Sequence, residues 1–192
     1  MACGSKADTS DSTASSDAKT DVSSQADANA KKIGILQYVQ HPALDKANEG
    51  FVAALKEAGM NVDIEQENAG GEQSAAQTIA NKLVNDKKDL ILVIATPAAQ
   101  AVAGATSDIP VVITAVTDPA ESGLVDSNEK PGGNVTGSSD LTPVADQIEL
   151  LTKILPEAKN VGILYCTAEA NSKLQAGLAM DALKAKGLNG VE

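Results

Sequence analysis

LILVIATPAAQ, residues 90–100, is the stretch that decides the fold. Residues 90–95 are apolar without interruption, which is typical of a central parallel strand buried on both faces. Thr96 and Pro97 follow at once and predict the start of a helix, with Thr96 as the N-cap and Pro97 at the first helical position. A buried strand that leads directly into a helix is the repeating unit of an α/β protein.

The same alternation extends along the chain in both directions. Short apolar runs predict further strands at residues 33–39, 62–67, 111–116, 134–137 and 161–165. Apolar residues at helical spacing predict further helices at residues 42–58, 71–84, 142–155 and 171–186. The crossovers are long enough for parallel pairing, so the predicted fold class is α/β with a doubly wound parallel sheet.

Composition excludes several classes of function. The formal net charge is −11, and no basic stripe is present that could neutralise nucleic-acid phosphates or anionic lipids. No apolar run reaches the roughly 18 residues that a membrane-spanning helix needs. One histidine and two distant cysteines, Cys3 and Cys166, have no metal-site spacing, and Cys166 is expected to be an inert small residue. Catalytic and phosphate-binding motifs are also missing, so we expect neither a cofactor nor an enzyme.

Residues 4–31 are dominated by Ser, Asp, Ala, Thr and Lys, which predicts a flexible tether without a core. The tether follows Cys3, which stands between Ala2 and Gly4 and so resembles the lipidated first residue of a mature bacterial lipoprotein. The charged and apolar regions of a signal peptide are absent from this sequence. Cys3 is therefore a predicted lipidation site, and the alternative is an ordinary cysteine in a polar tail.

Polar residues gather where the predicted strands end, and ligands of open parallel sheets bind at that edge. Hydroxyls near helix N-termini suit a carboxylate, and the neighbouring acids suit an ammonium, so a zwitterion such as an amino acid is expected. Tyr38 and Tyr165 could stack on a flat ligand or be half-buried in the core. The strand ends carry Tyr38, His41, Thr96, Thr117, Asp118, Ser139, Asp140 and Glu169.

Several of these residues have a purely structural alternative. Thr96 and Thr142 can act as N-caps alone. Asp118 precedes a proline and can serve only to form a turn. His41 is equally suited to capping the helix that follows it and to contacting a ligand.

Five stretches resemble, in order, the tryptophan/tyrosine-binding lipoproteins among the substrate-binding proteins of ABC transporters. They are IGILQYVQHPALD (33–45), IATPAAQAVA (94–103), ITAVTDPAESGLV (113–125), PGGNVTGSSDLTP (131–143) and VGILYCTAEANS (161–172). The resemblance implies a type I periplasmic-binding-protein fold, in which two α/β lobes hold a ligand between them. It also implies an importer with permease and ATPase subunits, and a lipid-anchored position on the outer face of the bacterial cytoplasmic membrane.

The segments that line the ligand cleft in this family correspond by position to residues of this sequence that include Glu169 and Asn171, near the last helix. Asp118 is the predicted partner of a ligand ammonium, and Thr96 with the start of its helix is the predicted carboxylate site. Tyr38 and Tyr165 are expected to pack against an aromatic ring. The remaining predicted ligand residues are His41, Thr117, Ser139 and Asp140.

We expect three regions: the tether at residues 1–31, a first lobe at 32–157, and the truncated beginning of a second lobe at 158–192. The chain is therefore expected to be a fragment that binds its ligand weakly. One alternative function is a ligand-sensing domain of a signalling or regulatory system. A second is an α/β hydrolase or transferase with an incomplete site.

Overall fold

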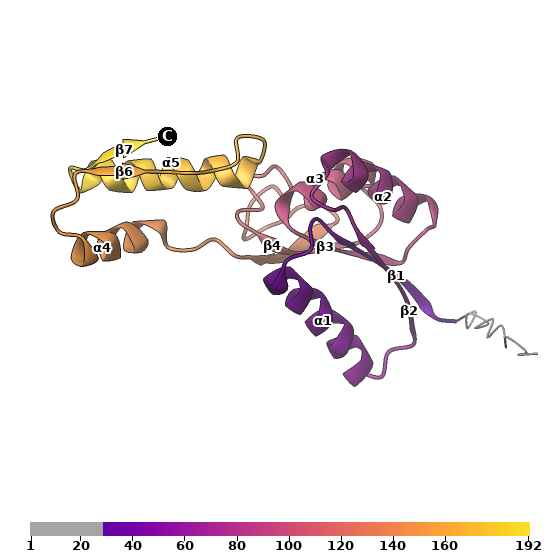
Figure 1. Ribbon diagram of the computed structural model, residues 1–192. Coiled ribbons are helices and arrows are strands. Elements are labelled where there is room, and N and C mark those ends of the chain that lie inside the picture. Colours follow the sequence, from indigo (N-terminus) through magenta and orange to yellow (C-terminus); the bar gives the residue numbers. More distant parts are fainter. Residues whose placement is uncertain (1–28) are drawn as a thin grey trace, which may run out of the picture.

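The computed structural model of the protein describes residues 29–192. Its elements are β1 (Lys31–Gln37), α1 (Pro42–Glu57), β2 (Val62–Asn68), α2 (Gln73–Asn85), β3 (Leu90–Ile94), α3 (Thr96–Ala105), β4 (Val111–Val116), β5 (Val135–Ser139), α4 (Val144–Ile154), β6 (Asn160–Gly162), α5 (Ala170–Ala185) and β7 (Asn189–Val191). Figure 1 shows two units joined by an extended segment. We call residues 29–140 the first lobe and residues 144–192 the second lobe.

The first lobe contains a five-stranded sheet in the order β2-β1-β3-β4-β5, and all of its strands are parallel. Helices α2 and α3 cover one face, and α1 lies on the other (Figure 1). The predicted doubly wound α/β class is therefore confirmed. Because neighbouring strands are parallel, the carboxyl ends of β1, β3 and β4 lie at one edge of the sheet.

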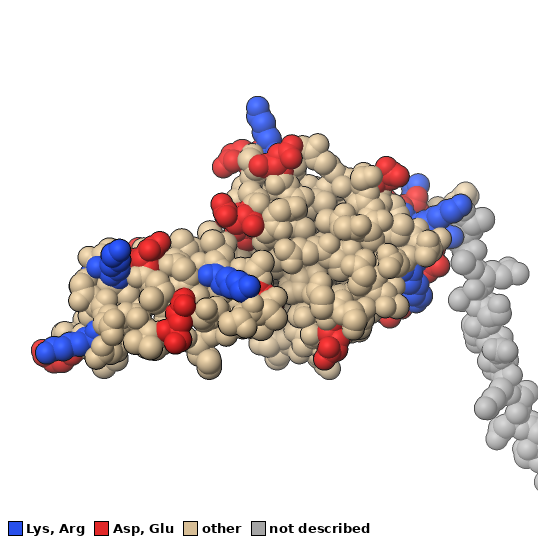
Figure 2. All heavy atoms as spheres, turned by 90° about the horizontal axis from the view of Figure 1, so that it is seen from above, with Lys and Arg blue, Asp and Glu red and all other residues tan. Residues whose placement is uncertain are grey.

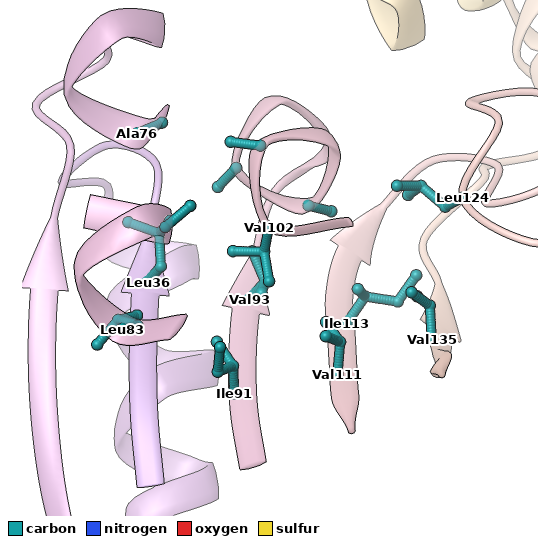
Figure 3. Packing of buried hydrophobic residues seen from close by; sticks show 14 of the residues in the cluster. Leu36, Ala76, Leu83, Ile91, Val93, Val102, Val111, Ile113, Leu124 and Val135 are labelled. Atoms are coloured by element: carbon teal, nitrogen blue, oxygen red, sulfur yellow. The ribbon is translucent and has the colours of Figure 1, made fainter. Parts of the chain in front are cut away.

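The core of the first lobe consists of aliphatic side chains that alternate between the two faces of the sheet. Leu36, Val93 and Ile113 point toward α2 and α3, where they pack with Leu83 and Val102 (Figure 3). Their neighbours along the strands form a second cluster that packs against Phe51 and other residues of α1; this cluster comprises Ile33, Ile35, Leu92 and Ile94. Burial on both faces explains why the predicted central strand has an unbroken apolar sequence.

Two predicted helix starts are shifted. Thr96 was expected as the N-cap of α3, but Ala95 holds that position and Thr96 is the first helical residue. The reason is the backbone of Ala95, whose φ of 87° turns the chain from β3 into α3 one residue early. Thr142 is also not the cap of α4, because Pro143 occupies the N-cap and makes no side-chain hydrogen bond. The two N-cap predictions were therefore wrong.

The second lobe is smaller. Strands β6 and β7 form a two-stranded parallel sheet, and α4 packs against α5. The strand predicted at residues 161–165 ends at Gly162, with one further backbone bond from Ile163 N to Val191 O at 2.8 Å. Within residues 29–192 it pairs with β7, which is three residues long, so Leu164 and Tyr165 have no strand partner in the described part of the chain.

The outer edge strand of the first lobe, β2, carries a cluster of ion pairs. Lys82 of α2 lies 2.5 Å from carboxylate oxygens of both Glu65 and Glu67, and Lys88 also bonds Glu65. Hydrogen bonds from Lys82 and then Lys88 lower the pKa of Glu65 to about 2, and the two carboxylates raise the pKa of Lys82. The cluster fixes α2 against the edge of the sheet.

Candidate functional site

A cavity of about 450 Å³ lies between the two lobes at the edge where β1 and β3 end. The first lobe contributes residues from the ends of β1 and β2 and from α3, and the second lobe contributes the turn before α5. The lining residues are Tyr38, Gly71, Gln73, Pro97, Gln100, Cys166, Ala168 and Glu169. We call this space the inter-lobe cavity.

Three helices begin at the wall of the inter-lobe cavity. Helix α2 begins at Gln73, α3 at Thr96, and α5 directly after Glu169. In none of the three does the N-cap side chain accept a hydrogen bond from the helix. The first N–H groups of a helix have no partner inside it, and the helix dipole makes that end positive. The three ends therefore favour an anionic group, although no cationic side chain lines the cavity.

The start of α3 contains two unusual features. Ala95 has a left-handed φ of 87°, which is costly for a residue with a Cβ atom and is commonly found at functional sites. Thr96 is 1% exposed, and its hydroxyl has no hydrogen-bond partner. A buried hydroxyl without a hydrogen-bond partner is unfavourable, and in a native protein it points to a functional or structural reason for its retention. The sequence placed this threonine at the site, and the structure puts it directly before Pro97 of the cavity wall.

Tyr38 is held in the cavity wall by its backbone. Its N–H donates to the carbonyl of Ile94 at 3.1 Å, and its carbonyl accepts from Gly71 N at 2.8 Å. Burial raises the pKa of the phenol, and the negative charges of Glu169 and Glu72 raise it further. The tyrosine is therefore neutral and offers an aromatic surface together with a hydroxyl.

Glu169 lies on the opposite side of the cavity, in the second lobe. It is the N-cap of α5, yet its carboxylate caps nothing, and the described residues donate no side-chain hydrogen bond to it. A turn fixes it, since Glu169 N donates to Cys166 O and Cys166 N donates to the hydroxyl of Ser172. The carboxylate is thus free to accept from a cation in the cavity.

Asp118 has a different environment. Its Oδ1 accepts from the Asn128 side chain at 3.0 Å and from the backbone N–H groups of Ala120 and Glu121. The Asn128 bond and these backbone bonds lower the pKa of Asp118. The carboxylate holds the loop after β4 and does not line the inter-lobe cavity. This arrangement matches the turn-forming alternative, and ligand binding by Asp118 stays a prediction.

Thr117 and Ser139 form a second connection between the lobes. Gln175 of α5 donates to the Thr117 hydroxyl at 3.4 Å. The Ser139 hydroxyl donates to the Thr117 carbonyl at 2.6 Å and accepts from Leu141 N in the segment between the lobes. These two predicted residues lie together, and they link β4, β5 and α5 beside the cleft.

The other predicted residues are dispersed. His41 caps α1, because its Nδ1 accepts from Ala43 N at 3.2 Å. Tyr165 lines a separate hollow between α4 and α5. Asp140 is exposed, and its backbone N–H donates to Val116 O. Asn171 has a buried side-chain oxygen without a partner. Their contact with a ligand stays a prediction.

Sequence reasoning missed Gln73 and Gln100 as residues of the cavity. Gln73 follows the two glycines at the end of β2, so the rule that sites form at strand ends could have found it. Gln100 lies one turn inside α3 and gave no such signal. Cys166, predicted to be inert, is an exposed free thiol at the cavity wall.

On the face shown in Figure 2, lysines stand singly or in small groups among acidic side chains. Within the described part of the chain, no three His, Cys, Asp or Glu residues could hold a metal ion together. No helix in residues 29–192 has the length and apolar character needed to cross a membrane. Cys3 and the predicted tether up to residue 28 lie outside the described residues.

Comparison with known proteins identifies the family. Residues 32–192 match the family model described as ABC transporter substrate binding protein. Members of this family bind substrates outside the cytoplasm and are not enzymes, in agreement with the sequence-based prediction. The tyrosine-binding protein of Clostridioides difficile (strain R20291) is 49% identical over 166 residues, which are 84% of this chain and 48% of that protein. The chain thus spans about half the length of this curated relative.

The similar solved structures include two that match this chain at 40% identity or more. A conserved domain protein from Vibrio cholerae superposes with a TM-score of 0.82 at 40% identity, covering 85% of this chain and 56% of that one. An ABC domain from Streptococcus pneumonia in complex with L-Trp gives a TM-score of 0.81 at 42% identity, covering 84% and 56%. These neighbours have the type I periplasmic-binding-protein fold. The chain therefore belongs to the family of ABC transporter substrate-binding proteins.

Proposed function

We propose that this protein captures an aromatic amino acid in the inter-lobe cavity and delivers it to the permease and ATPase subunits of an ABC importer. The observation that carries the proposal is the convergence of three helix N-termini, Tyr38 and Glu169 on one cavity between the lobes. The two ends of an amino acid carry opposite charges, and the cavity offers a partner for each.

The carboxylate of the ligand binds at the start of α3, where no side chain caps the first N–H groups and the Thr96 hydroxyl has no partner. The ammonium binds the free Glu169 carboxylate, which suits this role better than Asp118 because it faces the cavity. The ring packs between Tyr38 and Pro97. His41, Thr117, Ser139, Asp140, Tyr165 and Asn171 are assigned to further contacts made when the lobes approach.

Two relatives support the ligand class. The 49% identical protein is named for binding tyrosine, and the 42% identical structure holds L-Trp. We also propose that Cys3 carries a lipid that anchors the protein outside the cytoplasmic membrane. The packing of α4 on α5 supports a lobe boundary in residues 141–143, ahead of the boundary at 157 that was expected.

Calorimetric titration tests the function. L-tyrosine or L-tryptophan should bind, whereas L-lysine and L-glutamate should not. Glu169→Gln removes a charge-assisted hydrogen bond and should weaken binding by about tenfold or more. Asp118→Asn is the matched comparison, since it keeps the loop bonds of the side chain largely intact and should change affinity less. Absence of binding by both aromatic amino acids would contradict the proposal.

A further inference from the structure

We propose that Gln100 selects ligands whose aromatic ring carries a hydrogen-bond donor, so that tyrosine and tryptophan bind in preference to phenylalanine. The inference deepens the proposed function and depends on it. It starts from the position of Gln100, which lines the inter-lobe cavity together with Pro97, three residues earlier on the same face of α3.

Gln100 has a fixed amide orientation. Its Nε2 donates to the carbonyl of Ser122 at 3.1 Å, which distinguishes the nitrogen from the oxygen of the amide. Among the described residues, none donates to Oε1. Gln100 therefore lines the cavity beside the Pro97 ring with an unpaired acceptor, Oε1. The second N–H of its amide is also left over by the bond to Ser122.

The spacing along α3 fits the length of an aromatic amino acid. At 1.5 Å per residue, Gln100 lies roughly 6 Å along the helix from Thr96, where the ligand carboxylate is proposed to bind. A ligand that lies along α3 with its carboxylate at the helix start thus brings the far side of its ring near the Gln100 amide. Pro97, between the two, contacts the ring.

The rings of the three aromatic amino acids differ in whether they can donate a hydrogen bond to Oε1 of Gln100. A phenol hydroxyl can donate to Oε1, and so can the N–H of an indole. A phenyl ring displaces water from the amide and offers no replacement, which leaves the acceptor unsatisfied. A site that hydrogen-bonds a polar group of its ligand discriminates strongly against an analogue that lacks this group. An apolar pocket discriminates much less between ligands that differ only in size.

Titration of the 192-residue chain with L-tyrosine, L-tryptophan and L-phenylalanine tests the inference. The wild type should bind the first two at least about fivefold more tightly than phenylalanine, as one unsatisfied acceptor predicts. Gln100→Met keeps the length of the side chain and removes its hydrogen bonds. It should lower the affinity for tyrosine and tryptophan and raise that for phenylalanine, which no longer leaves an acceptor unsatisfied, so that the preference disappears.

The control is Gln66→Met, in a hollow between α1 and β2 away from the inter-lobe cavity, and it should keep the wild-type preference. Equal wild-type affinity for tyrosine and phenylalanine would overturn the inference while leaving the proposed function intact. Equal losses for all three ligands in Gln100→Met would also overturn it, since they would assign Gln100 only to holding Ser122. Binding of none of the three by the wild type would overturn the proposed function and this inference together.

Discussion

Strands β3 and β6 belong to units of the same α/β type, yet they differ in burial. Four of the five residues of β3 are buried, whereas Val161 of β6 is only partly buried and the residues on either side of it are exposed. Strand β3 has a strand on each side and helices on both faces, while β6 pairs with β7 alone. Burial in this molecule is thus decided by the number of flanking elements.

The exposed aliphatic residues follow the same division. In the second lobe, large side chains lie largely in solvent; they include Leu150, Ile154, Leu155 and Leu164. Three large side chains of this lobe are exceptions: Leu183 is fully buried under β7, and Val144 and Ile148 of α4 are also buried. If flanking elements also determine stability, the two lobes should differ in hydrogen exchange, in the cost of leucine truncation and in the effect of glycine substitution.

Hydrogen exchange should show the largest difference. Amides of β3 should exchange only when the whole first lobe unfolds, because both neighbouring strands must separate first. Amides of β6, β7 and α5 should exchange orders of magnitude faster through local opening. Exchange measured by NMR or mass spectrometry checks this. Equal protection in β3 and β6 would mean that two strands and two helices suffice for a stable core.

A pair of leucine truncations should show the next largest difference. Leu83→Ala removes a side chain with 0% exposure from the core beneath α2 and should lower the free energy of unfolding by about 2–5 kcal/mol. Leu164→Ala removes a side chain with 102% exposure and should change it by no more than about 0.5 kcal/mol. Denaturant unfolding measures both. A large cost for Leu164→Ala would show that this residue is covered in solution.

Two glycine-to-alanine substitutions test the packing of the lobes by adding an atom, where the leucine truncations remove atoms. A Cβ atom at Gly137 of β5 would lie 2.0 Å from the Ile113 carbonyl oxygen, so Gly137→Ala should cost roughly 1–3 kcal/mol. Gly177 of α5 has open space around it, and Gly177→Ala should stabilise the helix by about 0.5–1 kcal/mol. Thermal unfolding should give shifts of opposite sign. An unchanged or raised melting temperature for Gly137→Ala would contradict the close contact of β4 and β5.

The smallest expected effect is a change in how stability depends on pH below pH 4.5. Hydrogen bonds from Lys82 and Lys88 hold the pKa of Glu65 at about 2 in the folded protein, against an ordinary value of 4.5. A lowered folded pKa stabilises the protein above pH 4.5, and this contribution disappears as the pH falls toward 2. Glu65→Gln should therefore flatten the decline of stability between these values. Denaturant midpoints measured across this range would refute the prediction if mutant and wild type declined in parallel.

The sequence predicts much of the fold because burial leaves a local pattern. The unbroken apolar run of residues 90–95 can only be accommodated between two covered faces, and β3 lies there. Cap positions were harder to predict. The start of α3 depends on the left-handed turn at Ala95, and alanine gives no sequence signal for such a conformation.

The site could be predicted only in outline. Because strand ends meet at one edge, Tyr38 and Glu169 were expected in a ligand site; both line the inter-lobe cavity, and their contact with a ligand stays a prediction. The bond between Asp118 and Asn128 joins residues ten positions apart through a loop whose path no periodicity encodes. Gln100 was missed because its role depends on a neighbour, Ser122, that only the folded loop brings near α3.

The ion-paired edge of β2 has a consequence for behaviour at high concentration. Its unpaired backbone groups form a template on which another molecule could add a strand, and such addition starts fibre formation. Glu65 and Glu67, already bound by Lys82, would have to be covered by the incoming strand and would lose contact with water. The same charges that hold α2 in place thus act as gatekeepers against self-assembly along this edge.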